Sequence, residues 1–203
     1  MGRRQRPARI PPAEVTGLFG RFVTMMTRRM FGTTPESIGV MWHHKQVFKD
    51  GMGFGRKVEA WDELDPNLAT YASMAASAAV GCSFCLDLGY YMSHHKGLDE
   101  VKAREVPQWR ESTVFTPLER RVMEYAEAMC TTPVTVTDEL AAALLDDLGP
   151  AGLVELTARA GFANYSARSN IALGIRSEEF AETCGLPPLS GRPSDSTPVP
   201  SNA

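Results

Sequence analysis

The feature that most constrains the fold of this chain is a repeated helix-start signal. In this signal a capping residue is followed by proline and then by a stretch with helical periodicity. A proline in the first turn of a helix removes only a backbone N–H that would have no partner inside the helix. Such starts occur at Thr34-Pro35-Glu36, at Asp65-Pro66 and at Thr116-Pro117, the last within a capping box that ends in Glu119. No stretch shows the sustained alternation that is typical of a strand. We therefore expect an all-α fold.

The apolar spacing and the helix breakers predict where the helices run. We expect helices over about 13–31, 35–49, 66–80, 118–129, 138–148 and 150–172, the last two separated by Gly149-Pro150. The segment 50–60 contains Gly51, Gly53 and Gly55. A phosphate-binding glycine run needs a preceding strand, which is absent here, so we expect a flexible connection.

The two ends of the chain differ in composition from the part between them. Residues 1–11 carry a basic run followed by adjacent prolines, and we expect them to form a disordered arm. Residues 187–203 are rich in Pro, Ser, Thr and Gly, which predicts a disordered tail. Residues 12–180 then form a single helical domain, a size that suits one hydrophobic core.

Composition excludes several classes of function. The net charge is −3 and charged residues make up 22% of the chain, with both signs mixed, which is unlike a nucleic-acid-binding protein. No window has the run of apolar residues that a membrane span requires. The basic start is not followed by the apolar stretch of a signal peptide. We expect a cytoplasmic protein that binds neither nucleic acid nor membranes.

The motif Cys82-Ser83-Phe84-Cys85 carries the chemistry that the sequence indicates. Gly81 ends a helix of small residues, and the pattern from Cys82 to Met92 is helical again. Unpaired N–H groups and the positive end of the helix dipole gather at a helix start, where they stabilise a thiolate. Cysteines three residues apart share a helix face and can form a disulfide. The motif therefore predicts a pair that cycles between dithiol and disulfide.

Other interpretations of the cysteine pair remain. The two residues could be small apolar core residues. A zinc site would need two more ligands at short spacing, but Cys130 and Cys184 are isolated. The adjacent histidines at 43–44 and 94–95 point about 100° apart on a helix, which does not favour chelation. A thioredoxin-like protein would need a strand before the motif. We expect no metal and no cofactor.

Together these features resemble the carboxymuconolactone decarboxylase and alkyl hydroperoxidase D-like superfamily over roughly residues 35–176. The segments that carry the resemblance are 64–66, 81–87, 95–98, 115–120, 154–157, 161–165 and 168–174. The resemblance implies an all-helical bundle whose subunits assemble as trimers or hexamers. It also implies that two motif cysteines reduce peroxides in the hydroperoxidase members. By that analogy Cys85 attacks and Cys82 resolves, whereas reasoning from thioredoxin-like motifs favours Cys82 as the nucleophile.

The chain departs from the hydroperoxidase pattern at the proton relay. Those members carry a glutamate at the position of Thr70, a histidine at that of Gly89 and, in some, a histidine at that of Phe84. None of the three residues present here can act as a general base near neutral pH. The lactone decarboxylase members lack the cysteine pair, which argues against that activity here.

Other side chains could take over part of the relay. Asp87 and His94 are expected to point away from the cysteines on their own helix. His43 or His44 could reach the site from the preceding helix. Arg168, on the last core helix, is a candidate for stabilising a thiolate or a substrate anion.

These observations favour a thiol-dependent oxidoreductase that reduces a small peroxide or a disulfide and receives electrons from a dithiol donor. The alternative is an oligomeric redox-sensing or ligand-binding protein without turnover, because the relay is missing. A third hypothesis is a non-redox enzyme that acts on a small carbonyl or lactone compound. The chain has ten methionines, several of them with Phe19 and Phe22 on the first predicted helix, which favours burial between identical subunits.

Overall fold

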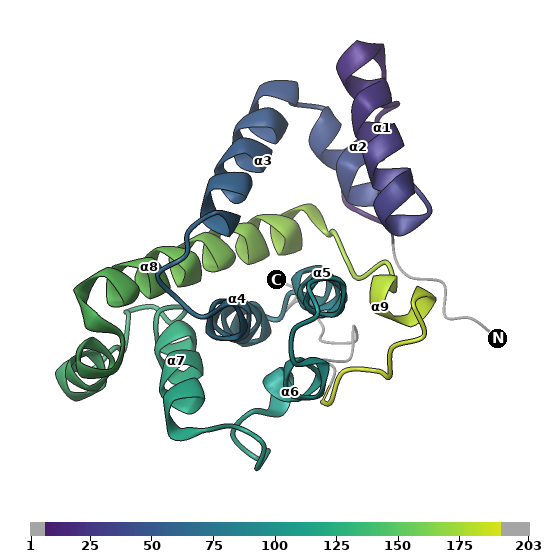
Figure 1. Ribbon diagram of the computed structural model, residues 1–203. Coiled ribbons are helices and arrows are strands. Elements are labelled where there is room, and N and C mark those ends of the chain that lie inside the picture. Colours follow the sequence, from purple (N-terminus) through teal and green to yellow (C-terminus); the bar gives the residue numbers. More distant parts are fainter. Residues whose placement is uncertain (1–6, 192–203) are drawn as a thin grey trace, which may run out of the picture.

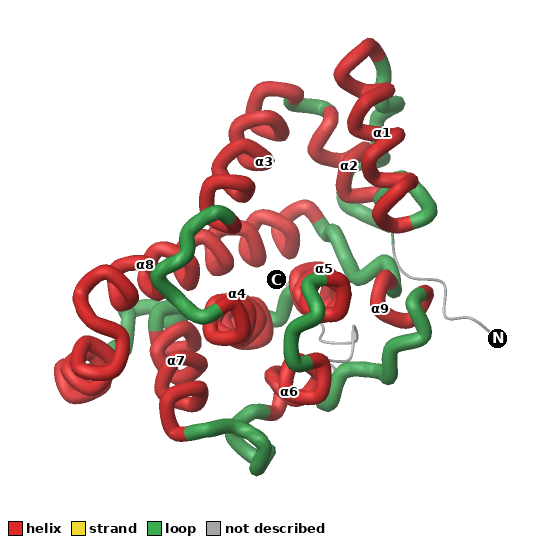
Figure 2. The backbone as a smooth tube through the Cα atoms, viewed as in Figure 1, coloured by secondary structure: helices red, strands yellow, loops and turns green. Residues whose placement is uncertain are grey.

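The structure, a computed structural model, describes residues 7–191, and none of these residues lies in a strand (Figures 1 and 2). The predicted all-α fold is confirmed. The helices in chain order are α1 (Gly17–Phe31), α2 (Glu36–Trp42), α3 (Lys45–Glu59), α4 (Pro66–Val80), α5 (Ser83–His95), α6 (Glu100–Glu105), α7 (Pro117–Ala128), α8 (Asp138–Leu173) and α9 (Phe180–Thr183).

The helix boundaries follow the capping residues that the sequence indicated. The carboxylate of Asp65 accepts hydrogen bonds from the first turn of α4. Thr116 and Glu119 form both bonds of the capping box at the start of α7. Gly81 ends α4 in the left-handed conformation, with φ 83°, and Gly149 interrupts α8 with φ 70°.

Helix α4 lies at the centre of the molecule, between α5, α7 and α8 (Figure 1). Its inward side chains Ala72, Ala75 and Ala76 are at most 2% exposed. Side chains this small let the neighbouring helices approach closely, as the run of small residues predicted. Because α5 follows α4 after a single turn, this packing also fixes the start of α5.

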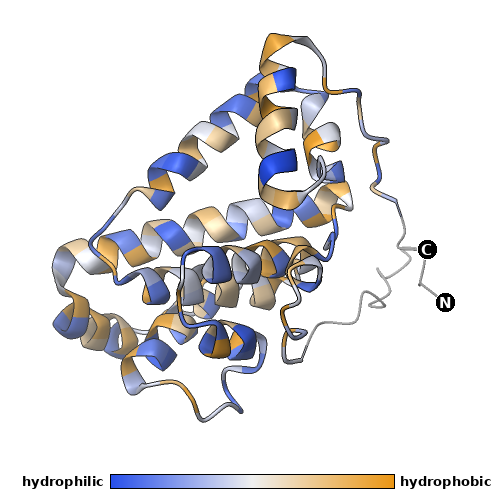
Figure 3. Cartoon of the chain, turned by 45° about the vertical axis from the view of Figure 1, so that its right-hand side comes forward, coloured by the Kyte–Doolittle hydropathy of each residue, from blue (hydrophilic) through white to orange (hydrophobic). Residues whose placement is uncertain are grey.

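The N-terminal helices α1, α2 and α3 lie to one side of this body (Figure 1). They share a small apolar cluster made of Val23, Trp42 and Phe48. Helix α1 leaves large apolar side chains exposed, including Leu18 at 86% and Met25 at 61% (Figure 3 shows the hydropathy of each residue).

Helix α3 differs from the expected flexible segment over 50–60, because it runs unbroken through Gly51, Gly53 and Gly55. The break falls earlier, where His44 accepts a hydrogen bond from the backbone N–H of Val47 and starts α3. Apolar residues at both ends of α3, Phe48 and Val58, are buried. Their burial outweighs the low helix propensity of the glycines, which the sequence pattern alone did not reveal.

Both ends of the described chain pack against the body, so the ordered part extends beyond 12–180. The backbone N–H of Arg9 donates to Leu173 O (2.9 Å), and its guanidinium donates to Ala172 O (2.5 Å). Near the other end, Ser190 N donates to Arg104 O (3.0 Å). The segments 7–11 and 187–191, for which we expected disorder, thus include residues that are hydrogen bonded to the body, while 1–6 and 192–203 lie outside the described residues. Within the described part, no helix has the length and hydropathy needed to cross a membrane.

Candidate active site

The structure brings the two motif sulfurs together at the start of α5. The turn after α4 is closed by hydrogen bonds from Gly81 N and Cys82 N to Ser77 O, at 3.0 and 2.9 Å. Cys82 is the N-cap of α5, and its sulfur accepts a hydrogen bond from Cys85 N at 3.3 Å. The two sulfurs are themselves hydrogen bonded at 2.6 Å, in the dithiol form.

The two cysteines differ in exposure and in protonation. Cys82 is only 1% exposed, whereas Cys85 lines a cavity. The hydrogen bond between the two sulfurs lowers the pKa of Cys82 despite the opposing effect of burial. The same bond, together with burial, raises the pKa of Cys85 well above its ordinary value. Cys82 is therefore the thiol of the pair that loses its proton more readily.

The cavity beside Cys85 has a volume of about 710 Å³ and lies between α3, α4, α5 and α8. Much of its wall is apolar or aromatic, including Trp61, Met74, Phe84, Leu88, Met92, Phe162 and Tyr165. Three serine hydroxyls in the wall donate to carbonyls of their own helices: Ser73 to Ala69 O, Ser77 to Ser73 O, and Ser169 to Tyr165 O. The cavity therefore suits an apolar ligand of considerable size.

Charged side chains gather at the far end of the cavity from the sulfurs. Lys96 pairs there with Glu59, and Arg159 pairs with Glu155 at 2.7 Å in a buried ion pair. From Cys85 to Lys96 the helix rises by about 16 Å, at about 1.5 Å per residue. None of the described charged side chains is hydrogen bonded to either sulfur.

The three relay positions face this same cavity. Thr70, Phe84 and Gly89 all line it, and none supplies an acid or a base. A side chain at position 89 would place its Cβ only 2.9 Å from Met74 Cγ. Met74 therefore occupies the space that a relay side chain would need, and the cavity is apolar where the hydroperoxidase pattern is polar.

Asn170 is a polar neighbour of the sulfurs that the sequence analysis did not single out. Its side-chain N–H donates to Cys85 Sγ at 3.3 Å from the last turn of α8. An asparagine does not titrate, so a search for acids and bases passes over it. Its position in the segment 168–174, which carries the family resemblance, was the available signal.

The other predicted contact residues have different partners. His43 Nε2 is hydrogen bonded to Pro11 O at 2.8 Å, and His44 caps α3. Arg168 donates to Asn164 Oδ1 and to Cys130 O, each at 2.7 Å, and so binds the turn that follows α7. None of these three predicted residues lines the cavity beside Cys85, and we assign them no role in the reaction.

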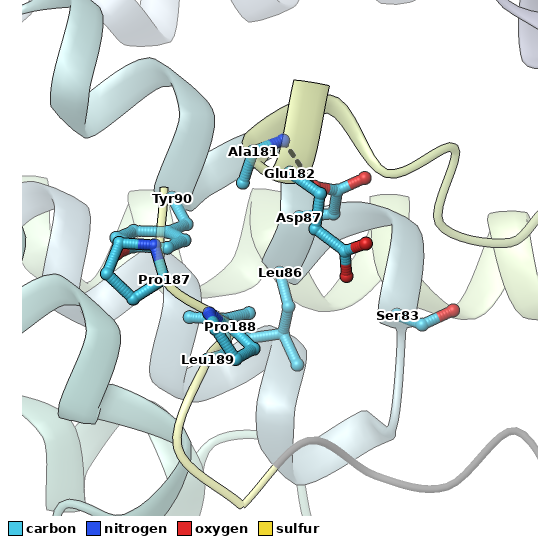
Figure 4. A pocket seen from close by; sticks show the side chains of 9 residues that line it. All are labelled: Ser83, Leu86, Asp87, Tyr90, Ala181, Glu182, Pro187, Pro188 and Leu189. Atoms are coloured by element: carbon cyan, nitrogen blue, oxygen red, sulfur yellow. Dashed lines mark hydrogen bonds between the residues drawn. The ribbon is translucent and has the colours of Figure 1, made fainter. Parts of the chain in front are cut away.

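Asp87 points away from the cysteines, as expected, and holds the C-terminal segment. It accepts hydrogen bonds from Ser177 Oγ (2.8 Å), Phe180 N (3.0 Å) and Ala181 N (3.0 Å). Ser83, inside the motif, accepts a further bond from Ser177 N at 3.1 Å. Figure 4 shows the pocket beside Asp87. This pocket has a volume of about 20 Å³, which gives room for about one water.

His94, also expected to point away, pairs with Glu100 at 3.2 Å. Among residues 7–191 there is no group of three or more His, Cys, Asp or Glu side chains that could hold a metal ion.

Comparisons with known proteins show a family likeness and a shared fold. The sequence pattern of the carboxymuconolactone decarboxylase family matches residues 47–128. The uncharacterized protein YnjA of Escherichia coli (strain K12) is 36% identical over 124 residues, which cover 61% of this chain and 66% of YnjA. The chain thus spans slightly less than two thirds of that relative's length.

Two solved structures share the fold at low sequence identity. The debrominase Bmp8 in complex with 2,3,4-tribromopyrrole has a TM-score of 0.75 and 17% identity, covering 88% of this chain and 96% of Bmp8. A peroxidase-related protein from Ralstonia eutropha JMP134, described as an alkylhydroperoxidase AhpD core, has a TM-score of 0.75 and 19% identity, covering 86% and 95%.

Proposed function

We propose that this chain is a member of the carboxymuconolactone decarboxylase and alkyl hydroperoxidase D-like superfamily and a peroxidase-related thiol oxidoreductase that uses Cys82 and Cys85. Its substrate is a peroxide or a disulfide. The observation that carries the proposal is the arrangement of the sulfurs: Cys85 lines a cavity of about 710 Å³ while it contacts an enclosed Cys82. This arrangement supports Cys85 as the attacking residue and Cys82 as the resolving residue.

The missing relay is replaced by the cysteine pair itself. Cys82 loses its proton more readily than Cys85, because the hydrogen bond between the two sulfurs lowers the pKa of Cys82. When Cys85 attacks, its proton passes to Cys82 across the 2.6 Å contact. Cys82 thus serves first as the base for Cys85 and then as the resolving thiol.

The reaction with a hydroperoxide balances with these two residues. The Cys85 sulfur attacks the terminal oxygen, the O–O bond breaks, and the alkoxide takes the proton held by Cys82 to leave as an alcohol. The Cys82 thiolate then attacks the sulfenic acid on Cys85, and hydroxide leaves to become water. The resulting disulfide returns to the dithiol by taking two electrons and two protons from an external dithiol donor. Such a donor fits the reducing cytoplasm, which we propose as the location.

The experiment measures consumption of cumene hydroperoxide by the protein with dithiothreitol as donor. Cys85→Ser is expected to abolish turnover. In Cys82→Ser we also expect sulfenic acid at Cys85 to form more slowly, since the base is lost. Cys184→Ser, which changes an exposed cysteine outside the cavity, is the matched control and should behave like the unaltered protein. Unchanged turnover in Cys85→Ser would refute the proposal.

A halogenated aromatic ring is the second substrate class to assay. The debrominase Bmp8 has this fold, and the cavity here presents the rings of Trp61, Phe84, Phe162 and Tyr165. The dithiol would supply the two electrons and the one proton that replace a ring bromine by hydrogen. Bromide and the second proton would be released, and the cysteines would form the disulfide. Bromide release from tribromopyrrole, measured with the same variants, tests this class.

The alternative without turnover keeps one structural argument in its favour. The motif helix is tied through Ser83 and Asp87 to the segment 177–181, so disulfide formation at its first turn can be transmitted there. A redox sensor would bind ligand or assemble differently in its oxidised and reduced forms. Equal ligand affinity and equal assembly in the two forms would remove this alternative.

We also propose that the chain assembles as a homo-oligomer, a trimer or a hexamer. The support is the apolar face of α1, where Leu18, Phe22 and Met25 are 86%, 52% and 61% exposed. These residues follow helical spacing and form one stripe. Light scattering of the full chain measures the mass of the assembly, and a monomer at micromolar concentration would contradict the proposal.

A further inference from the structure

We propose that Asn170 is a catalytic residue of this site, whose side-chain amide stabilises negative charge on the Cys85 sulfur as that sulfur reacts. The inference rests on the proposed function in taking Cys85 as the reacting sulfur. Asn170 Nδ2 lies 3.3 Å from Cys85 Sγ, and Asn170 lines the same cavity. A donor at this position meets both the sulfur and any group that the sulfur attacks.

The hydroxyl of Ser77 is the other polar side-chain group near Cys85. It donates to Ser73 O at 2.8 Å, and it lowers the pKa of Cys85 by less than Asn170 does. The backbone N–H of Cys85 donates to Cys82 Sγ. The charged residues that line the cavity, Glu59, Asp62, Lys96 and Arg159, belong to its far end. Asp87 of α5 faces α9. Among the described side chains, the Asn170 amide is the nitrogen donor directed at the Cys85 sulfur.

The position of Asn170 is fixed by the way α8 ends. Gly174, in the left-handed conformation, and Ile175 both donate their backbone N–H groups to Asn170 O. The guanidinium of Arg9 then caps the following carbonyls, donating to Ala172 O at 2.5 Å. A cation at a helix C-terminus also suits the helix dipole. Arg9 is therefore a positioning residue that acts on the site through Asn170.

The chemistry of an amide defines what Asn170 can do. An N–H that donates to sulfur favours the thiolate over the thiol, so Asn170 lowers the pKa of both cysteines. The amide does not titrate, so it cannot accept the Cys85 proton, a step that falls to Cys82. The rate at which Cys85 reacts should then rise with pH as the thiols lose their protons. A catalytic carboxyl or imidazole would add a second pH-dependent change in the rate, which we do not expect.

The experiment measures alkylation of the reduced protein by iodoacetamide over a pH series, with the label on Cys85 quantified by mass spectrometry. The sulfur displaces iodide, so the rate follows the thiolate fraction. Asn170→Ala should react about tenfold more slowly at pH 7, as expected for the loss of one hydrogen bond to a charged group, with the curve moved to higher pH. Arg9→Ala should shift the rate in the same direction by less.

Two further variants make the result decisive. Asn164→Ala removes an amide of the same helix, but this amide binds Arg168 and not a sulfur. This variant should react like the unaltered protein. Asn170→Asp keeps the shape but sets a carboxylate against the thiolate, so it should react more slowly even if Asn170→Ala does not fold. An unchanged rate and pH curve in Asn170→Ala, or an equal or faster rate in Asn170→Asp, would overturn the proposal. Labelling needs no peroxide, so a protein that labels as expected but lacks turnover refutes the proposed function alone.

Discussion

Helices α3 and α4 line the same cavity and are both rich in small residues, but for different reasons. In α4, Ala72 and Ala76 are fully buried, and the neighbouring helices leave no room for a larger side chain. In α3, a Cβ added at Gly51 or Gly53 would meet nothing within 4 Å. The small residues of α4 are thus required by packing, whereas the glycines of α3 only lower the stability of their own helix.

The cavity is therefore bounded by tightly packed helices on one side and by α3, a helix of lower stability, on the other. The wall formed by α4, α5 and α8 fixes the sulfurs and Asn170 within hydrogen-bond distance of each other. Helix α3 rests on α8 through Phe54 and Phe162, whose ring centroids are 5.1 Å apart. A cover of low helix stability gives a large apolar substrate a way to a cavity whose chemistry must stay fixed.

The largest effect on the free energy of unfolding is expected from a substitution in α4. Ala76→Leu inserts a large side chain where the exposed fraction is 0% and should lower the free energy of unfolding by about 1–3 kcal/mol. Ala142→Leu makes the same change at an exposed position of α8 and should have little effect. Urea unfolding measures both. Equal stabilities for the two variants would mean that α4 is not tightly packed.

A smaller effect of opposite sign is expected on α3. Gly51→Ala and Gly53→Ala together should raise the free energy of unfolding by about 1–2 kcal/mol, because each alanine favours the helix and meets no neighbour. Gly81→Ala is the control of opposite sign, since φ 83° is costly for alanine. Slower hydrogen exchange in α3 would accompany the gain. Loss of stability in the double glycine variant would contradict an uncrowded α3.

The smallest effect concerns the attachment of α2. Glu178 accepts hydrogen bonds from Glu36 N and Ser37 N, yet burial raises its pKa. Because the folded pKa lies above the unfolded value of about 4.3, the folded protein takes up the proton first. This group therefore adds stability as the pH falls through the folded pKa towards 4.3.

Glu178→Gln should remove that acid-side gain and change stability at pH 7 by less than about 0.5 kcal/mol. Urea unfolding at several pH values between 7 and 4 checks this, with Glu124→Gln on the exposed side of α7 as control. An unaltered pH dependence in Glu178→Gln would show that another carboxyl is responsible.

The sequence predicted those parts of the fold that depend on local signals. The starts at Asp65-Pro66 and Thr116-Pro117 and the breaks at Gly81 and Gly149 each act through a backbone conformation or a cap within a few residues. The course of α3 was missed because burial of Phe48 and Val58 overrides local propensity.

The candidate site likewise combines a local feature that the sequence predicted with a distant contact that it did not predict. The adjacency of Cys82 and Cys85 follows from their spacing on one helix. The partner Asn170 lies 85 residues away along the chain, and only the packing of α8 against α5 brings it to the sulfur. The contacts that Arg9 and Ser190 make with the body could likewise not be predicted from composition, which indicated disorder at both ends.

The proposed chemistry depends most on Cys85 facing the cavity while Cys82 is enclosed. Brief treatment of the native, reduced protein with iodoacetamide at pH 7, followed by mass spectrometry of the separate cysteines, tests this directly. We predict label on Cys85 and none on Cys82 until the protein is unfolded, although the pKa of Cys82 is lowered and that of Cys85 is raised. Labelling of Cys82 first, or of both cysteines at the same rate, would contradict the account.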